Sequence, residues 1–185
     1  MKNLNSNVQI KEDRLASVAR LARLAVETFV ASGVQLTTPA ELAGILSTPG
    51  ACFVSIKTRT GDLRGCIGTI EPAKQTLADE VIMNAINAAT RDPRFPPVST
   101  DELASLVYSV DILAAPEPSC LEDLDPAVYG VIVEDETGYA RGLLLPDIMG
   151  VNTVAQQIEI AARKAGIAPG KKLKLSRFRV ERFRE

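Results

Sequence analysis

The sequence predicts an α+β fold with a mainly antiparallel sheet and flanking helices. Two stretches have the pattern of β-hairpins, residues 51–70 around a turn at 59–62 and residues 129–145 around a turn at 136–138. Stretches with apolar residues at three- and four-residue spacing, typical of helices, lie before, between and after them. The strict alternation of strand and helix that indicates a parallel sheet is missing, so we expect neighbouring strands to run antiparallel.

The elements outside the hairpins follow from capping residues and periodicity. The first helix is expected to begin at Asp13, a good N-cap, and to end at Gly33. The remaining elements are expected in the order helix 73–90, strand 106–114, helix 153–165 and strand 173–183. The last strand alternates imperfectly, which suggests a bulge near Ser176 or Glu181. Residues 1–12 are expected to form a loose N-terminal segment, and the domain to begin at residue 13.

Composition places the chain among ordinary globular proteins. Its 185 residues are 46% hydrophobic and 24% charged, which is enough to bury a sizeable core. No apolar run approaches the roughly 20 residues of a membrane span, and the first residues lack the apolar region of a secretory signal. We therefore expect a cytoplasmic protein.

The residue types that are missing exclude several classes of enzyme. With no histidine, the chain has no Ser-His-Asp triad, no Cys-His dyad and no imidazole ligand for a metal. Its three cysteines, Cys52, Cys66 and Cys120, are far apart and form no Cys-x-x-Cys pair, so neither a zinc site nor a disulfide framework is expected. Phosphate-loop, dinucleotide-binding and calcium-loop patterns are also missing. We expect no metal and no cofactor.

Charge is distributed unevenly along the chain. Residues 101–150 hold eleven acidic residues and one basic residue, whereas residues 163–185 hold nine basic and two acidic ones. One interpretation is a basic tail that binds RNA through Lys171, Lys172, Lys174, Arg177 and Arg179. The other is that the two segments lie side by side and neutralise each other.

The segment Leu63-Arg-Gly-Cys-Ile-Gly-Thr69 is the first candidate for chemistry. On a strand, Arg64, Cys66 and Gly68 share one face, and a guanidinium close to a thiol favours the nucleophilic thiolate. The functional interpretation is a reactive or ligand-contacting Cys66. The structural interpretation is a small buried cysteine, with glycines that let a helix approach the sheet.

The segment Asp92-Pro-Arg-Phe-Pro-Pro97 is the second candidate. Its prolines hold the backbone extended, so Asp92 and Arg94 could be displayed to a polar substrate. Alternatively, Asp92 and Arg94 pair with each other on the surface while Phe95 enters the core. Arg141, at the start of Arg141-Gly-Leu-Leu-Leu-Pro146, is a third displayed arginine that carries little information alone.

These segments resemble the signature of the AMMECR-type domain family. Leu63–Thr69 resembles its first motif and Asp92–Pro97 its second, and Gly130-Val-Ile-Val133 and Arg141–Pro146 follow in the family's order. The resemblance extends from about residue 13 to the C-terminus. The chain departs from the family in lacking the tryptophans common between the Leu-Leu-Leu-Pro motif and the last strand.

The resemblance implies a single domain over residues 13–185 with a larger and a smaller lobe, and no established reaction. In prokaryotes the family is associated with a Memo-like protein and a radical-SAM enzyme, in the AmmeMemoRadiSam system. We therefore expect a small enzyme or substrate-presenting component that acts with these partners through Cys66. Substrate or partner contacts are assigned to Arg64, Gly65, Gly68, Thr69, Asp92, Arg94 and Arg141. The alternative is a non-catalytic module that binds protein or RNA.

Overall fold

The chain forms two compact units. The computed structural model describes the backbone of residues 2–185 and the side chains of residues 17–185. One unit comprises Met1–Ile112 with Arg182–Glu185, and the other comprises Leu113–Glu181. Each unit contains a four-stranded sheet with mainly antiparallel pairing and a helix packed on it. The α+β class, with flanking helices and a larger and a smaller lobe, is confirmed.

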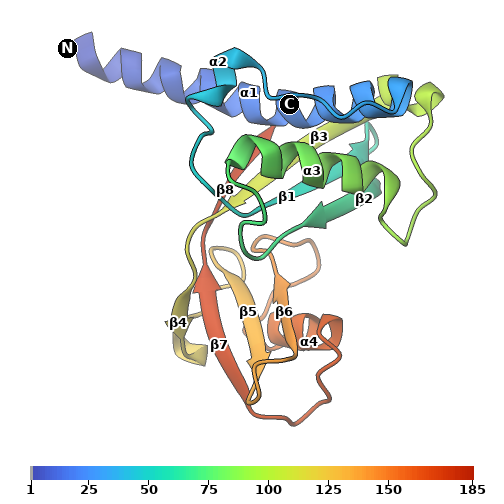
Figure 1. Cartoon of the computed structure of the whole chain (residues 1–185). Helices are drawn as coiled ribbons and strands as arrows, with labels where there is room; N and C mark the ends of the chain where they lie inside the picture. Colours follow the sequence, from blue (N-terminus) through green and yellow to red (C-terminus); the bar gives the residue numbers. More distant parts are fainter. Residues whose placement is uncertain (1) are drawn as a thin grey trace. The chain divides into compact units, whose positions relative to one another are not determined.

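The first unit is built on the sheet β2-β1-β3-β8 (Figure 1). Its strands are β1 (Cys52–Thr58), β2 (Leu63–Gly68), β3 (Leu106–Leu113) and β8 (Val180–Arg184). Its helices are α1 (Lys2–Ser32), α2 (Ala40–Ala43), α3 (Leu77–Thr90) and the 3-10 helix η1 (Thr100–Ser105). The hairpin β1–β2 and the strand β3 lie where the sequence predicts them.

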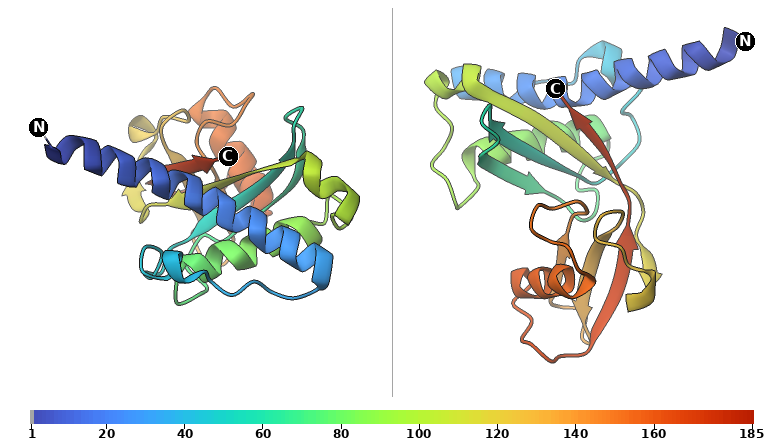
Figure 2. Two further views of the ribbon diagram at one scale, coloured as in Figure 1. Left: turned by 90° about the horizontal axis from the view of Figure 1, so that it is seen from above. Right: turned by 180° about the vertical axis from the view of Figure 1, so that it is seen from behind.

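The core of this unit lies between the sheet and helices α1 and α3. Val54 and Ile56 of β1 are fully buried in one cluster with apolar residues of both helices, and Tyr108 of β3 and Phe183 of β8 join the same cluster. Seen from behind in Figure 2, the strands lie in front of these helices. Side chains alternate between faces along each strand, so the neighbours of these residues form the opposite face of the sheet. We call this the outer face; it carries Phe53, Ser55, Lys57, Cys66, Gly68, Val107, Ser109, Asp111, Arg182 and Arg184.

The second unit repeats the plan on a smaller scale. Its sheet has the order β4-β7-β5-β6, and helix α4 packs on β5 and β6. The elements are β4 (Glu117–Ser119), the 3-10 helix η2 (Leu121–Asp123), β5 (Gly130–Asp135), β6 (Arg141–Leu144), α4 (Val154–Lys164) and β7 (Leu173–Phe178). Val131 and Val133 of β5 pack with Ala161 of α4 in its core. The predicted hairpin β5–β6 and helix α4 are therefore present.

Two predictions differ from the structure. The segment 173–183 is not one bulged strand: it divides at Arg179 into β7 and β8, which belong to different sheets. The reason is that the ring of Phe178 packs on Gly130 of the second unit, whereas Phe183 lies in the core of the first. Helix α1 begins at Lys2 rather than at Asp13. The side chains of residues 1–16, and Met1 as a whole, lie outside the described residues, so the loose attachment of residues 1–12 stays a prediction.

Candidate functional site

Strand β2 is an edge strand that carries the first motif, and its two faces have different surroundings. Lys57 pairs with Leu63 and Ile56 with Gly65, so Arg64 is the extra residue of a β-bulge. A Cβ atom at Gly65 would collide with the carbonyl oxygen of Ala88 in helix α3. Gly65 therefore lets the helix backbone approach the sheet, as the structural interpretation predicted.

Thr69, predicted as a ligand contact, lies on the helix side of the strand. Its hydroxyl donates to Oε1 of Glu80 at 2.5 Å, and the side-chain amide of Asn84 lies 3.4 Å from its oxygen. Glu80 is fully buried and also accepts the backbone N–H groups of Ala73 and Lys74. Thr69 and Glu80 thus hold the segment that follows β2 against α3.

Cys66 lies on the outer face, and its side chain is half-buried. Its sulfur accepts a hydrogen bond from the Ser55 hydroxyl at 3.3 Å, across the β1–β2 pairing. On the same face, the ring of Phe53 lies so close to Gly68 that a Cβ there would collide with it. Gly68 therefore makes room for an aromatic ring beside the thiol.

The second motif covers the open edge of β2. The backbone N–H of Cys66 donates to Oδ2 of Asp92 at 2.8 Å, and Nη2 of Arg94 donates to the Cys66 carbonyl at 3.4 Å. A carboxylate and a guanidinium thus take the place of a neighbouring strand. Edge strands with unsatisfied backbone groups invite aggregation, and this arrangement protects the edge.

Asp92 and Arg94 form a two-point ion pair. Nε and Nη2 of Arg94 donate to the two carboxylate oxygens of Asp92 at 2.9 and 2.7 Å. The side chain of Asp92 is only 2% exposed, whereas that of Arg94 is 54% exposed. Hydrogen bonds from the Arg94 side chain lower the pKa of Asp92 to about 2. Asp92 is therefore a buried anion that orients a cation which itself remains open to solvent.

Arg64 reaches past the strand edge. Its Nε and Nη2 donate to the two oxygens of Glu102 at 2.7 and 3.1 Å, and Nη1 donates to the Pro96 carbonyl at 2.9 Å. The guanidinium groups of Arg64 and Arg94 lie 6.0 and 5.4 Å from the centre of the half-buried Phe95 ring. The hydrogen bonds from Arg64 lower the pKa of Glu102 to about 2. Glu102 compensates the charge of Arg64.

The structure brings four predicted residues together in the first unit, and it adds partners that the sequence analysis missed. Arg64, Cys66, Asp92 and Arg94 lie around the edge of β2. Glu102 was missed, although it completes a capping box with Ser99 that is visible as a Ser-x-x-Glu pattern. Ser55 was also missed; its signal is the alternation of the polar residues Ser55 and Lys57 with the apolar Val54 and Ile56.

Arg141 belongs to the second unit. It begins β6, and its Nε lies 3.8 Å from a carboxylate oxygen of Glu134 on the neighbouring strand β5. Its neighbour Gly142 lies under helix α4, where a Cβ atom would collide with the carbonyl oxygen of Ala161. Arg141 is thus part of a cross-strand charge pair within the second unit.

The basic strand β7 lies beside acidic strands of the same unit. Arg177 pairs with Glu117 at 2.7 Å, and Lys172 and Lys174 pair with Glu136 and Glu134 at 3.8 Å. Three of the five basic residues proposed to bind RNA are therefore paired with acidic residues of neighbouring segments. The uneven charge along the chain is neutralised locally at these pairs. Arg177 and Arg179 also lie on the ring of Tyr129, at 4.5 and 4.6 Å from its centre.

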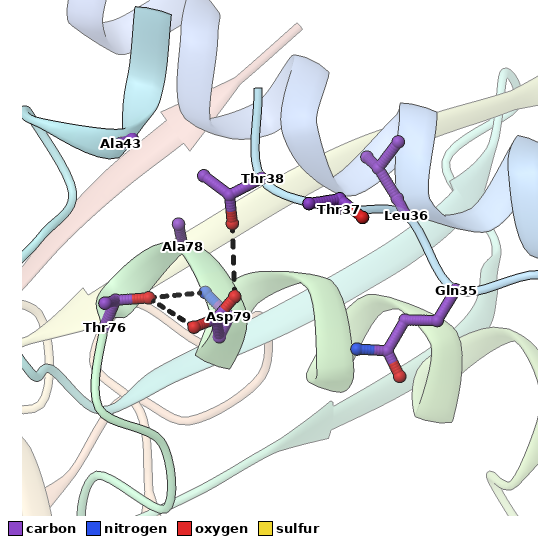
Figure 3. A pocket seen from close by; sticks show the side chains of 8 residues that line it. All are labelled: Gln35, Leu36, Thr37, Thr38, Ala43, Thr76, Ala78 and Asp79. Atoms are coloured by element: carbon purple, nitrogen blue, oxygen red, sulfur yellow. Dashed lines mark hydrogen bonds between the residues drawn. The ribbon is translucent and has the colours of Figure 1, made fainter. Parts of the chain in front are cut away.

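A pocket of about 360 Å³ opens in the first unit beside the start of α3 (Figure 3). It is lined by residues 35–38, Ala43, Thr76, Ala78 and Asp79, and includes none of the predicted site residues. The hydroxyls of Thr38 and Thr76 both donate to the carboxylate of Asp79, at 3.1 and 2.8 Å. Because Thr38 and Thr76 both bond to Asp79 in the first turn of α3, we interpret this end of the pocket as part of the α3 N-cap.

The three cysteines have different environments. Cys52 is fully buried, and burial raises the pKa of its thiol to about 12. Cys120 is exposed and donates to Asp123 at 3.1 Å, which raises the pKa of that thiol. Cys66 is intermediate in exposure between them. In the part of the chain that the structure describes, no group of three or more acidic or cysteine side chains is arranged to hold a metal ion.

Comparison with known proteins shows the family. The AMMECR1 family model matches residues 19–185, so the chain belongs to this family and the resemblance seen in its motifs is confirmed. A protein of Thermotoga maritima is 54% identical over 134 residues, which are 71% of this chain and 76% of that protein. A longer protein of Clostridium acetobutylicum is 50% identical over 133 residues, 72% of this chain but 28% of its own length.

The fold is shared with a solved structure. The crystal structure of the uncharacterised protein PH0010 from Pyrococcus horikoshii matches with a TM-score of 0.82 and 30% identity, over 90% of this chain and 89% of that chain. None of these names states a reaction or a ligand. Among the described residues, no helix is both long and apolar enough to cross a membrane.

Proposed function

We propose that this protein is a small enzyme or substrate-presenting component that uses Cys66 on the outer face of its first unit. The observation that carries the proposal is the placement of this thiol: half-buried, 3.3 Å from the Ser55 hydroxyl, on a backbone held by Asp92. A nucleophile held in a fixed position reacts faster, because less orientational entropy is lost on the way to the transition state. Four charged side chains hold the backbone around Cys66 in this way: Arg64, Asp92, Arg94 and Glu102.

The proposed chemistry assigns one role to each residue. The Cys66 thiol loses its proton to water, and its sulfur then forms a bond to an electrophilic carbon of the substrate while the leaving group departs with its electron pair. The exposed guanidinium of Arg94 contacts a polar group of the substrate, and Asp92 is the positioning residue that orients it. Arg64 and Glu102 hold the segment that carries Arg94.

The proposed partners come from the family. We propose that the chain acts in the cytoplasm with a Memo-like protein and a radical-SAM enzyme, as one component of an AmmeMemoRadiSam system. Each purified partner is mixed with the chain, and complexes are measured by native mass spectrometry. A complex that Arg94→Gln weakens supports a partner site at the outer face, whereas no complex with either protein contradicts this part of the proposal.

An RNA-binding role has less support than the cysteine site. Three of the five basic side chains on which it depends are paired with glutamates. Neutralised cations release few counterions from a phosphate backbone and therefore contribute little affinity. We therefore place the function at the outer face of the first unit.

The experiment is alkylation of the folded protein by iodoacetamide across a pH series, read for each cysteine by mass spectrometry. Cys52 is the internal control for a sealed thiol and Cys120 for an exposed one. We expect Cys66 to react in the folded protein, with an apparent pKa below that of Cys120, while Cys52 reacts only after unfolding. A Cys66 that stays unmodified until the protein unfolds would overturn the proposal.

A matched variant separates the thiol's surroundings from its accessibility. Ser55→Ala removes the hydroxyl that donates to the sulfur and leaves the charged groups around β2 in place. Because that hydrogen bond favours the thiolate, its loss is expected to raise the apparent pKa of Cys66 while leaving Cys120 unchanged. An unchanged Cys66 profile in this variant would remove Ser55 from the proposed site.

A further inference from the structure

We propose that the outer face of the first unit binds a small ligand with an anionic oxygen group, a phosphate or a carboxylate, beside Cys66. This inference rests on the proposed function, because it names the chemical class of ligand for the same site. It is carried by the charge of the face and by its unused hydrogen-bond donors. Both follow from the residues that β1, β3 and β8 place there.

The outer face has more cations than it has acidic partners for them. Of the residues that form it, three are basic and only Asp111 is acidic. Arg182 pairs with Asp111, donating to its two oxygens at 2.6 and 3.3 Å. Lys57 and Arg184 are exposed and make no ion pair with any residue that the structure describes. The face therefore keeps two positive charges after its own pair is formed.

The middle of the face holds three short side chains, each half-buried. Cys66, Ser55 and Ser109 lie in one row across β2, β1 and β3, directly opposite one another in the strand register. The Ser109 hydroxyl makes no hydrogen bond to the described part of the chain, although this residue is half-buried. A hydroxyl in this position can donate to an anionic oxygen, as Lys57 and Arg184 can from either side.

Arg94 adds a third cation at the edge of the same face. Its guanidinium is more than half-exposed although both oxygens of Asp92 hold it in place. A planar guanidinium fixed by one carboxylate is preorganised for a second anion on its open side. An anionic group beside Cys66 would thus have the guanidinium of Arg94 at the strand edge and Lys57 on the neighbouring strand, with the Ser55 hydroxyl next to the thiol.

The test compares two alkylating reagents that differ in charge. Iodoacetate is an anion and iodoacetamide is neutral, and both react with the same thiolate. The ratio of their rates at one cysteine therefore cancels the thiolate fraction and reports the local electrostatic potential. We expect a higher iodoacetate-to-iodoacetamide ratio at Cys66 than in the unfolded protein. At Cys120, which lies beside Asp123, we expect a lower ratio.

Variants identify the source of the potential. Lys57→Gln is expected to lower the ratio at Cys66 about twofold, the effect of one charge at roughly 8 Å in a water-like medium. Arg184→Gln is expected to lower it by about 1.5-fold, because β8 is separated from β2 by two strands and its residues lie about 14 Å away. Arg20→Gln is the matched control, since this exposed residue lies on α1, which covers the other face of the sheet. A ratio that neither substitution changes would overturn the inference. High salt should also abolish the effect, because the screening length is only about 3 Å at 1 M.

Protection distinguishes the two kinds of anion. Inorganic pyrophosphate and citrate are added separately at millimolar concentration while Cys66 is alkylated by neutral iodoacetamide. Slowing by pyrophosphate alone supports a phosphate group, and slowing by citrate alone supports a carboxylate. Protection by neither in the wild-type protein overturns the inference. If Cys66 does not react with iodoacetamide at all, the proposed function fails instead, so the two failures are distinguishable.

Discussion

Strands β2 and β6 invite comparison, because both carry an Arg-Gly pair near their start. In each strand the glycine lies under a helix: a Cβ at Gly65 would collide with a carbonyl of α3, and one at Gly142 with a carbonyl of α4. In each strand the arginine also pairs with a glutamate. The distance is 2.7 Å for Arg64 and 3.8 Å for Arg141.

The difference between the strands lies in the residue after the glycine and in the covering of the edge. Leu143 of β6 is buried, and its carbonyl accepts a hydrogen bond from Lys164 at 3.2 Å. Cys66 of β2 is half-exposed, and its backbone is held by Asp92 and Arg94. The Arg-Gly pair is thus an architectural device common to both units. What sets the first unit apart is the thiol and the charged pair beside it.

The largest loss of stability is expected at the glycine that each of the two strands places under a helix. Gly65→Ala and Gly142→Ala each place a methyl group against a helix carbonyl, and we expect each to destabilise its own unit by about 3 kcal/mol. Hydrogen exchange read by mass spectrometry assigns the loss to one unit or the other. Gly44→Ala is the control, because nothing lies within 4 Å of a Cβ there and the backbone is helical. A Gly65→Ala protein as stable as the Gly44→Ala protein would refute the close approach.

The next effect tests what distinguishes β2. Asp92→Asn keeps an acceptor for the Cys66 N–H but removes the charge that Arg94 contacts, and we expect a loss of about 2 kcal/mol. Urea unfolding measures this loss. A double-mutant cycle with Arg94→Gln then isolates the pair, since the second substitution should cost little once the first is present. Additive losses would show that the two side chains stabilise the edge independently.

A pH profile sharpens the same point. The pKa of Asp92 is about 2 in the folded protein, below its ordinary value of about 4, so its ionised form stabilises the native state. That stability is fully present above pH 4 and is lost as the pH falls toward 2. We expect the urea midpoint to drop over this window, and to drop less in Asp92→Asn. Equal drops in the two proteins would exclude Asp92 as the source.

The smallest effect is expected at the charge pair of β6. Glu134 lies 3.8 Å from both Arg141 and Lys174, and its side chain is about a third exposed. Such pairs contribute between about 0 and 1 kcal/mol, so Glu134→Gln should change the free energy of unfolding by roughly 0.5 kcal/mol or less. Urea unfolding of the Glu134→Gln and Asp92→Asn proteins, measured side by side, provides the contrast. A loss as large as that of Asp92→Asn would erase the difference between the two units.

Local patterns in the sequence predicted much of the fold. Both hairpins, helix α4 and strand β3 were recognisable, because their apolar spacing depends only on neighbouring residues. The glycine within the strand predicts a close helix approach at Gly65 as one of two interpretations, and the spacing of Asp92 and Arg94 predicts their pairing as one of the alternatives for that segment. These features involve residues that are adjacent in sequence or a single glycine within a strand.

The sequence by itself determined the class of fold, the family and the residues that deserve a test. Only the tertiary structure decided that there are two sheets, that the last strand divides between them, and that Glu102 and Ser55 lie at the site. Glu102 is far from Arg64 along the chain, and Ser55 meets Cys66 only through the register of β1 and β2. Such contacts depend on which strands pair and how the core closes. These long-range events leave no periodic signal in a single sequence.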